Sequence, residues 1–378
     1  MGALGARVKA ATGSGGKPMT AAIIGHSGRG NYGHGLEQVF SDRPGIEIVG
    51  LADADAVGRA KTQERVRARR VYSDYQEMLA KERPQLVSVA PRWTDQHYAM
   101  VSAALAVGAH VYCEKPFTRT LADADALLAV ARKSGLKIAV AHQARLAPQT
   151  LLLKQKIADG LVGELLEIRV HGKQDKRAGG EDLLVLGTHQ FDLVRFFAGD
   201  AHGCSARILQ QDREVTLAEV REGTEDIGPI IGDEIEAQFA LSHGVNVHYT
   251  SRAKNAAVAG PWGMEFVGTR GRVRLLNDVH TLVYVLQPGL TKHLGASQAW
   301  VPLASAPGGA VVAAGGMVTA NRVVVDDWLA AIAADREPVC SGYAAMKSLE
   351  MIHAIFAAGL SRGRVELPLR NRQHPLSI

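Results

Sequence analysis

Glycines cluster at residues 25–30, directly after the first short apolar run of the sequence. Glycine lets the backbone turn tightly and approach a pyrophosphate, and a helix that begins after such a loop adds free N–H groups and the positive end of its dipole. A strict Gly-x-Gly-x-x-Gly also occurs at residues 28–33, so two registers of the loop fit. The residues expected to contact a dinucleotide here are Gly25, Ser27, Gly28, Arg29 and Gly30.

Asp53 ends the second apolar run, roughly 20 residues beyond this loop. A carboxylate at that place can accept hydrogen bonds from both ribose hydroxyls of NAD and repels the 2′-phosphate of NADP. Neither Arg nor Lys follows Asp53 directly, although Arg29 flanks the loop and works against this discrimination. This order of elements predicts dinucleotide binding: a strand, the glycines, a helix, a second strand and an acidic residue. The acidic residue favours NAD over NADP.

The tripeptide Glu114-Lys115-Pro116 follows the fourth apolar run. Ligands of open parallel sheets bind beyond the carboxyl ends of the strands, so this tripeptide is expected to face the cofactor. A lysine held there by its neighbours can donate a hydrogen bond to a substrate hydroxyl and take part in proton transfer, and the proline stiffens the backbone after it. A surface lysine at a strand end is the alternative interpretation.

His189 lies in a helix predicted at residues 182–198. Asp192 follows it on the same helical face, and Asp182 lies about two turns before it. A neutral imidazole with a pKa near neutrality suits the removal of a hydroxyl proton as hydride leaves the same carbon. A buried structural histidine is the alternative interpretation.

Short apolar runs rich in Val, Ile and Ala alternate with longer amphipathic segments up to about residue 143. The runs are too short for helices and are typical of strands buried on both faces. Helices are predicted at residues 96–107 and 121–133, where apolar residues recur at three- and four-residue spacing. This alternation predicts a parallel sheet with right-handed crossovers. The expected strands are residues 21–24, 46–52, 86–90, 110–113 and 138–141.

The rhythm changes in the second half of the chain. A helix near residues 149–158 precedes an alternating strand at residues 165–171, and later strand-like segments are joined by short Gly-containing turns. Such spacing predicts an antiparallel or mixed sheet. Residues 302–316, rich in Ala, Gly and Pro, are expected to form a loop. The further strands are expected at residues 235–241, 245–251, 264–267, 272–276 and 282–286, and closing helices at residues 321–334 and 344–360.

Composition excludes several classes of protein. The 378 residues are 47% apolar and 21% charged, which excludes a disordered chain. No apolar run approaches the ~20 residues of a membrane span, and the first residues lack the apolar core of a signal peptide. The net charge is only +5, and the basic cluster at residues 65–70 has no interleaved aromatic residues. We therefore expect a solvated helix face there, with neither nucleic acid nor a membrane as partner.

Three scattered cysteines, Cys113, Cys204 and Cys340, are too few for a disulfide framework or a zinc site. They fit a reducing cytoplasm. Cys113 neighbours Glu114, but its place at a strand end favours a buried thiol over a nucleophile.

The sequence resembles the Gfo/Idh/MocA family of sugar and cyclitol oxidoreductases from about residue 20 to its end. The stretch Gly13-Ser14-Gly15-Gly16-Lys17 predicts a flexible tail at residues 1–19. The resemblance implies a Rossmann domain at residues 20–143. It also implies a C-terminal α/β domain at residues 144–378 with a large, open, mostly antiparallel sheet, which binds substrate and assembles homodimers or homotetramers. The motifs that carry it are the loop at residues 25–30, Ala52-Asp53, Glu114-Lys115-Pro116 and Gly187-Thr188-His189-Gln190-Phe191-Asp192.

Two positions depart from the family pattern. Family members often place an Asp four residues before the histidine, where it orients the ring, but Val185 stands there in this chain. Asp182 or another group must then serve. Ser27 stands where the family usually has the second glycine of its loop.

Several polar residues are expected near the same site, although a surface role stays open for each. Two flank the loop where the family lines its nicotinamide pocket, two follow the fifth strand, and four lie between a strand and the helix of His189, where they could form a polar wall for sugar hydroxyls. In that order they are Pro91 and His97, Gln143 and Arg145, and Lys173, Arg177, Glu181 and Asp182.

The resemblance implies NAD-dependent transfer of hydride between a ring carbinol of a sugar, glycoside or cyclitol and the nicotinamide, with the substrate between the domains. Lys115 is expected to hold the hydroxyl oxygen and His189 to take its proton. Two other functions stay open. One is a glycosidase that keeps its NAD and acts by transient oxidation, and the other is a non-catalytic regulator that binds NAD and sugar.

Overall fold

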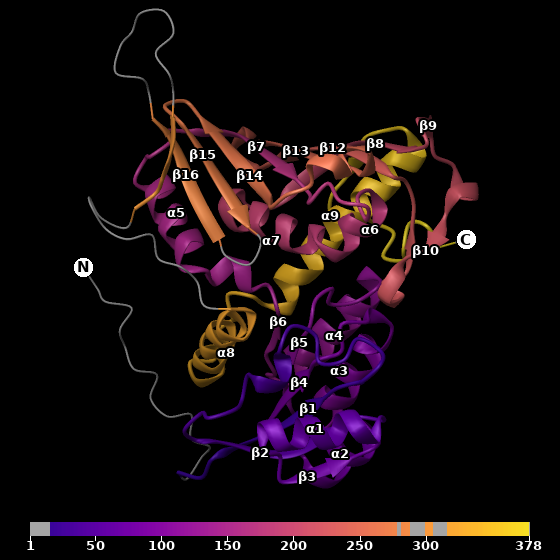
Figure 1. The fold of residues 1–378 in the computed structure, drawn as a ribbon, viewed down its shortest axis with the longest axis vertical. Helices are drawn as coiled ribbons and strands as arrows, with labels where there is room; N and C mark the ends of the chain where they lie inside the picture. The colour runs from indigo at the N-terminus through magenta and orange to yellow at the C-terminus, as the bar shows by residue number, and fades with distance from the viewer. Residues whose placement is uncertain (1–15, 278–280, 288–298, 305–315, 378) are drawn as a thin grey trace, which may run out of the picture. The chain divides into compact units, whose positions relative to one another are not determined.

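The computed structural model describes residues 16–277, 281–287, 299–304 and 316–377 (Figure 1). Most of the tail expected at residues 1–19 and of the loop expected at residues 302–316 lies outside these residues. Contacts divide the chain into two compact units. The first unit comprises Met1–Gln143, Glu225–Ile227 and Met317–Met346, and the second comprises Ala144–Thr224, Gly228–Gly316 and Lys347–Ile378.

Six strands form the sheet of the first unit, in the order β3-β2-β1-β4-β5-β6, and every pair is parallel. The predicted parallel sheet is confirmed. The strand order reverses between β1 and β4, and ligands of such sheets bind at this switch point, beyond the carboxyl ends of the strands. The strands are β1 (Met19–Ile24), β2 (Ile46–Ala52), β3 (Arg70–Tyr72), β4 (Leu86–Val89), β5 (His110–Cys113) and β6 (Ile138–Val140).

Three helices of the first unit begin at residues whose side chains cap them. The side chains of Asp55, Asp74 and Thr120 each accept a backbone N–H of the first turn, which satisfies a donor that the helix itself cannot. Helix α8, which contains Asn321, comes from far along the chain. It is joined to this unit by the Tyr112 hydroxyl, which donates to Asn321 Oδ1 at 2.7 Å. The helices are α1 (Ala56–Val66), α2 (Tyr75–Glu82), α3 (His97–Ala106), α4 (Leu121–Lys133) and α8 (Met317–Ala333).

The helix predicted directly after the glycine-rich loop is wrong. Turns follow β1, and then a single turn of 3-10 helix at Leu36–Gln38. Gly28, Gly30, Gly33 and Gly35 have φ of +79°, +82°, +57° and +84°. An α-helix cannot continue through left-handed residues, so these glycines build turns and the expected helix dipole is missing from this loop.

The second unit contains an open sheet whose strand order is β17-β16-β15-β14-β7-β13-β12-β8-β18, with β9 paired to β8. Only the pair β7–β13 is parallel among these strands, so the predicted mostly antiparallel sheet is confirmed. The strands are β7 (Leu165–His171), β8 (Ala201–Gln210), β9 (Arg213–Glu214), β12 (Glu234–Leu241), β13 (Asn246–Arg252), β14 (Trp262–Gly268), β15 (Arg272–Asn277), β16 (Thr281–Gln287), β17 (Ala299–Pro302) and β18 (Val365–Glu366).

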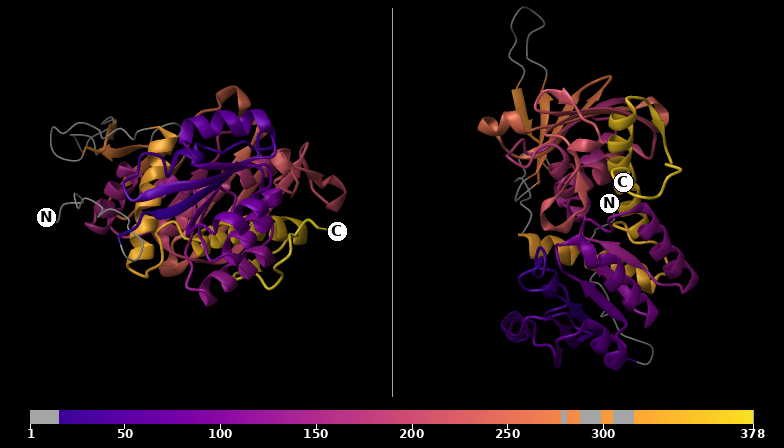
Figure 2. Two further views of the ribbon diagram at one scale, coloured as in Figure 1. Left: turned by 90° about the horizontal axis from the view of Figure 1, so that it is seen from below. Right: turned by 90° about the vertical axis from the view of Figure 1, so that its right-hand side faces the viewer.

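Helices cover one face of this sheet (Figures 1 and 2). Phe191 joins helix and sheet, because its ring centroid lies 5.4 Å from that of Phe239 on β12 and 5.3 Å from that of Tyr249 on β13. Burying such aromatic rings fixes the helix against the sheet. The helices are α5 (Pro148–Ala158), α6 (Gly180–Val185), α7 (Gly187–Ala198) and α9 (Gly342–Ser361).

The single helix predicted at residues 182–198 is instead two helices, α6 and α7, which meet at Leu186. Gly187 follows this break, and glycine is among the weakest helix formers. Asp182 and His189 therefore belong to different helices and do not share one helical face.

The arginine cluster at residues 65–70 is not one helix face either. Arg65 lies on α1, Arg67 caps its C-terminus in the left-handed region, and Arg70 begins β3. Arg65 pairs with buried Glu37 at 2.6 Å. Among the described residues, we find no helix that is long and apolar enough to cross a membrane.

Candidate active site

Close backbone contacts surround the loop at residues 25–30. A Cβ on Gly30 would stand 2.5 Å from the backbone nitrogens of Arg92 and Trp93, and a Cβ on Gly25 would stand 2.0 Å from the ring of Tyr32. A Cβ on Gly28 would meet no described atom within 4 Å. The loop therefore needs glycine at two places for packing and presents an open backbone surface at Gly28, which suits the approach of a pyrophosphate.

Asp53 is almost fully buried and holds this loop in place. Its carboxylate accepts the Ser27 N–H at 3.1 Å, the Ser27 hydroxyl at 2.7 Å and the Tyr32 hydroxyl at 2.7 Å. The Asp55 N–H adds a fourth donor at 3.0 Å. Burial raises the pKa of Tyr32, so its hydroxyl stays a donor. A ribose hydroxyl that binds Asp53 must share the carboxylate with these groups.

A pocket of about 300 Å³ adjoins the loop within the first unit. Ser27, Tyr32, Gly58 and Lys61 are among the residues that line it. The loop, the pocket and the carboxylate fit a dinucleotide, although the helix N-terminus that usually completes such a site is replaced by turns.

Glu114 is fully buried at the carboxyl end of β5. It accepts the backbone N–H groups of His34 at 3.2 Å and Lys115 at 3.0 Å, and His34 Nδ1 lies 3.2 Å from Oε2. Burial raises the pKa of Glu114, but the charge and hydrogen bonds of His34 and the charge of Lys115 outweigh burial and bring it to about 2. Glu114 is thus a buried anion that fixes the loop and the lysine backbone together.

Lys115 is only 5% exposed and follows this carboxylate directly. Its neighbour Cys113 is buried, and burial raises the pKa of that thiol well above its usual range. The sequence interpretation missed His34, the residue that connects the loop to Glu114. Its position next to Gly33, the last glycine of the strict motif, is the signal that could have found it.

His97 and Pro91 brace the loops of the first unit. His97 is fully buried, and its Nδ1 and Nε2 lie 2.8 Å from the Pro116 carbonyl oxygen and 2.7 Å from the Pro91 carbonyl oxygen. The imidazole therefore joins the loop after β4 to the loop after Lys115. Gln143, predicted near the cleft, lies in the same unit and its Nε2 contacts the Met317 sulfur at 3.6 Å.

His189 is buried on α7 of the second unit. Its ring stacks on Trp262 at the start of β14, with centroids 6.1 Å apart and planes inclined by 26°. Trp262 was also missed from sequence, because a tryptophan at the edge of a strand reads as ordinary core. The stack fixes the orientation of the imidazole.

Asp182 is 5% exposed and accepts the Ser251 hydroxyl at 3.0 Å. Burial raises the pKa of Asp182 to about 6, and the Ser251 hydrogen bond opposes the increase. A Cβ on Gly172 would stand 2.0 Å from Asp182 Oδ2, so the backbone directly after β7 packs closely against this carboxylate. A carboxyl group that titrates near neutrality is a candidate for proton transfer.

Arg145 forms a two-pronged ion pair with Asp192, one helical turn beyond His189. Its Nε and Nη2 donate to the two carboxylate oxygens at 2.8 and 2.6 Å, and Nη2 also donates to the Asp192 backbone carbonyl at 3.0 Å. Both side chains are buried. This pair anchors the helix of His189 within the second unit.

The remaining candidates surround α6. Arg177 Nε donates to Glu181 at 2.6 Å, and the Thr224 hydroxyl donates to the same carboxylate oxygen at 2.6 Å. Lys173 lies near enough to Asp182 for its charge to lower the carboxyl pKa slightly. The structure thus groups Lys173, Arg177 and Glu181 around Asp182 in one unit, and the loop, Asp53, Glu114 and Lys115 in the other.

Family models match both units. The model described as the NAD-binding Rossmann fold of an oxidoreductase family matches residues 19–142, and the model of its C-terminal alpha/beta domain matches residues 154–367. The chain belongs to the Gfo/Idh/MocA oxidoreductase family. The predicted family and NAD as its cofactor are confirmed.

Curated relatives and a solved structure resemble this chain over about half of its length or more. D-apiose dehydrogenase from Paraburkholderia graminis is 26% identical over 92% of this chain and 90% of its own. D-glucoside 3-dehydrogenase from Escherichia coli is 27% identical over 48% of this chain and 54% of its own. The solved structure of levoglucosan dehydrogenase in complex with NADH and L-sorbose, at 18% identity, covers 93% of this chain and 99% of its own, with a TM-score of 0.73.

Proposed function

We propose that this Gfo/Idh/MocA oxidoreductase is an NAD-dependent dehydrogenase that moves hydride between a ring carbinol of a sugar, glycoside or cyclitol and the nicotinamide. The observation that carries the proposal is the buried Lys115, placed by Glu114 at the carboxyl end of β5 in the NAD-binding unit. Relatives named as D-apiose and D-glucoside dehydrogenases support the choice of substrate class.

Two side chains are proposed to handle the reacting hydroxyl group. Lys115 donates a hydrogen bond to its oxygen and, as a cation, stabilises negative charge that develops there. His189, held by the Trp262 stack, removes the hydroxyl proton. NAD, when bound, accepts the hydride. Asp182 supplies a second titrating group in the second unit, which we propose to bind the substrate together with Lys173, Arg177 and Arg145.

The remaining cofactor contacts are proposed for the loop. Gly25, Ser27, Gly28, Arg29 and Gly30 would hold the pyrophosphate, and Asp53 the ribose. Pro91, His97 and Glu114 would act through the loops that they fix, because their polar groups are bonded to the protein itself.

A substrate screen tests the function. Purified protein with NAD is offered a panel of hexoses, pentoses, glycosides, inositols and uronates, and NADH formation is followed by its absorbance. We expect NADH with at least one ring carbinol. Release of free sugar from a glycoside without net NADH would indicate the hydrolytic mechanism instead, and binding of NAD and sugar without turnover would indicate a regulator.

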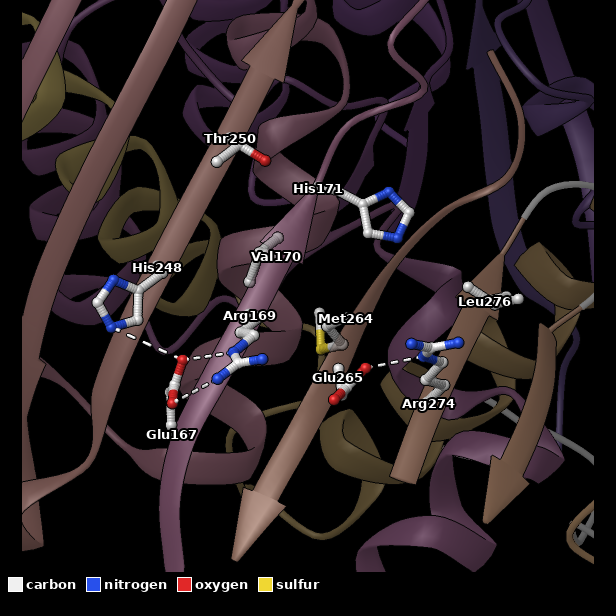
Figure 3. A pocket seen from close by; sticks show the side chains of 10 residues that line it. All are labelled: Glu167, Arg169, Val170, His171, His248, Thr250, Met264, Glu265, Arg274 and Leu276. Carbon is white, nitrogen blue, oxygen red and sulfur yellow. Dashed lines mark hydrogen bonds and ion pairs between the residues drawn. The ribbon is translucent and has the colours of Figure 1, made fainter. Parts of the chain in front are cut away.

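We further propose that copies of this chain assemble through the outer face of the second sheet. Among the described residues, the helices lie on the other face. A hollow of about 500 Å³ on the outer face is lined by both charged and apolar side chains, among them Arg169, Arg274 and Met264 (Figure 3). The charged side chains are already paired with one another on this face, with Glu167–Arg169 at 2.6 Å and Glu265–Arg274 at 2.8 Å. Such a face, with its charges already paired and apolar side chains between them, could pack against its own copy.

Light scattering tests this assembly. A dimer or tetramer is expected, and Arg169→Glu combined with Arg274→Glu should yield monomer. A wild-type monomer contradicts the proposal.

We place the enzyme in the cytoplasm, because its three buried cysteines fit a reducing compartment.

A further inference from the structure

Two acidic residues occupy the tip of a hairpin between β10 (Arg221–Glu222) and β11 (Pro229–Ile230). The hairpin is closed by a hydrogen bond from the Gly223 N–H to the Gly228 carbonyl at 2.9 Å. Glu225 and Asp226 at its tip have φ of +59° and +48°. Left-handed backbone is unfavourable for residues other than glycine, so other contacts must hold the tip in this shape.

Three arginines supply those contacts, and all of them belong with the tip to the first unit. Arg29 pairs with the Asp226 carboxylate. Arg92 Nε lies 3.0 Å from Glu225 Oε2. Arg119 donates from Nε at 2.8 Å and from Nη2 at 2.6 Å to the Asp226 backbone carbonyl. One two-residue tip therefore receives a guanidinium group from three separate places in the chain.

These three places are the loops that follow β1, β4 and β5. Arg29 stands between Gly28 and Gly30 of the loop at residues 25–30. Arg92 follows Pro91, and Arg119 comes four residues after Lys115. The first two loops also touch directly, because the Arg92 N–H donates to the Gly30 carbonyl at 3.1 Å. The carboxyl ends of these strands form the cofactor edge of the sheet.

The charges at this edge balance only when the tip is included. Arg29 also donates to Asp95 at 2.7 Å, so three guanidinium groups meet the three carboxylates of Asp95, Glu225 and Asp226. Without the tip, the same loops would carry an excess of positive charge at close range, and mutual repulsion would favour their separation.

We propose that Glu225 and Asp226 are positioning residues for the cofactor. By holding Arg29, Arg92 and Arg119 they keep the three loops of the cofactor edge together, and this arrangement retains bound NAD. The inference rests on the proposed placement of the pyrophosphate at residues 25–30. It goes beyond that placement, because it assigns control of cofactor residence time to a segment roughly 200 residues away in sequence.

The rate of NADH dissociation tests the proposal directly. The full-length double variant Glu225→Gln/Asp226→Asn is compared with wild type by stopped-flow displacement of NADH, followed by its fluorescence. We expect dissociation to be about tenfold faster or more, since lost charge pairs at such contacts act mainly on the dissociation rate. The KM for NAD should rise while kcat at saturating NAD stays within about twofold of wild type.

Matched variants separate positioning from a general loss of structure. Glu222→Gln removes one charge from the exposed stem of the same hairpin and should dissociate NADH at the wild-type rate. Asp226→Glu keeps the charge and should restore most of the retention. The wild-type dissociation rate should also increase from low salt to about 0.5 M NaCl, because the paired groups are partly exposed, and the double variant should lose this dependence.

Two outcomes would overturn the proposal. NADH dissociation within twofold of wild type in the double variant would show that the tip does not control residence time. Tighter NADH binding would show instead that the tip competes with the pyrophosphate for the arginines. Gly30→Ala tests the underlying placement separately, since normal NADH binding by that variant would contradict the placement itself, whatever the tip does.

Discussion

Two buried carboxyl groups, one in each unit, have pKa values that are shifted in opposite directions. Glu114 is fully buried beside His34 and Lys115, and these neighbours lower its pKa to about 2 in spite of burial. Asp182 is nearly as buried, but its main partner is the neutral hydroxyl of Ser251, and burial raises its pKa to about 6. Burial alone therefore does not decide the charge of a carboxyl group. The balance of burial against hydrogen bonds and nearby charges decides it.

The difference matches two tasks. A permanent anion such as Glu114 can hold backbone N–H groups and a lysine in fixed positions at any physiological pH. A carboxyl group that titrates near neutrality, such as Asp182, can exchange a proton during turnover. We infer that the first unit provides a rigid cofactor and lysine site, and the second unit the groups that move protons.

The largest effect is expected at the side chains proposed to act on the hydroxyl group. Lys115→Met and His189→Asn should each lower kcat about 10²-fold or more. The first removes the ammonium group proposed to hold the hydroxyl oxygen, and the second removes the imidazole proposed to take its proton. The dissociation constant for NAD should stay within about threefold. Steady-state rates and NAD titrations check both statements.

Lys81→Met and His243→Asn serve as controls for these variants. They remove an exposed lysine and a turn histidine of the same chain and should keep the wild-type rate. Near-normal turnover of both Lys115→Met and His189→Asn would contradict the site assignment.

Glu114→Gln should give the next largest effect, a loss of about 3 kcal/mol of stability near neutral pH, from the shift between 4.5 and about 2. The folded pKa lies below the unfolded value, so this stabilisation is complete above pH 4.5 and disappears as the pH falls toward 2. Denaturant unfolding across this range measures it. Glu77→Gln, which breaks an exposed pair with Lys81, is the control. If the free energy of unfolding of Glu114→Gln changed with acid pH as that of the wild type does, Glu114 could not be a buried anion.

Asp182→Asn should increase stability near neutral pH, whereas Glu114→Gln should decrease it. The folded pKa of about 6 lies above the usual 3.8, so stability falls as the pH rises through this interval and stays reduced above it. The amide cannot ionise, and the variant should gain about 3 kcal/mol near pH 8 with no gain near pH 4. Its kcat should fall at the same time. Equal pH dependence of stability in variant and wild type would refute the raised pKa.

Trp262 is expected to contribute less than the residue it supports. Trp262→Ala should lower kcat about fivefold by freeing the His189 ring, since an aromatic stack is worth about 1 kcal/mol. Trp262→Phe should restore most of the rate. NAD binding should not change in either variant, and a fall in NAD affinity would indicate a wider structural effect.

Tyr32→Phe should have the smallest effect. It removes one of the donors that occupy Asp53, which leaves the carboxylate more available to ribose hydroxyls. The dissociation constant for NAD should fall about threefold, the value of one modest hydrogen bond. Isothermal titration measures it. Weaker binding would mean that Tyr32 holds Asp53 in its productive position.

Much of the fold could be predicted from the sequence, because strands buried on both faces leave a plain signal. The expected strands at residues 46–52, 110–113 and 165–171 coincide with β2, β5 and β7. The helix after β1 could not be predicted correctly from the motif, since four glycines in left-handed conformation replaced it with turns. The break at Leu186, directly before Gly187, also divides a helix that apolar periodicity alone presents as continuous.

Contacts between residues far apart in sequence account for what sequence missed around the candidate site. His34 pairs with Glu114, Trp262 stacks on His189, and Asp226 meets Arg29. Each pair is separated by about 70 residues or more, so no local pattern joins its members. The sequence shows which chemical groups are present, but it does not show which residues they contact.

Transfer of deuterium tests the central claim most directly. The sugar or polyol identified by the screen is labelled with deuterium at the ring carbon that carries the reacting hydroxyl, and the cofactor is analysed by mass spectrometry after turnover with NAD. The account predicts reduced cofactor that has gained one deuterium from each oxidised substrate molecule. Reduced cofactor without the label, or substrate consumed with no reduced cofactor at any stage, would contradict it.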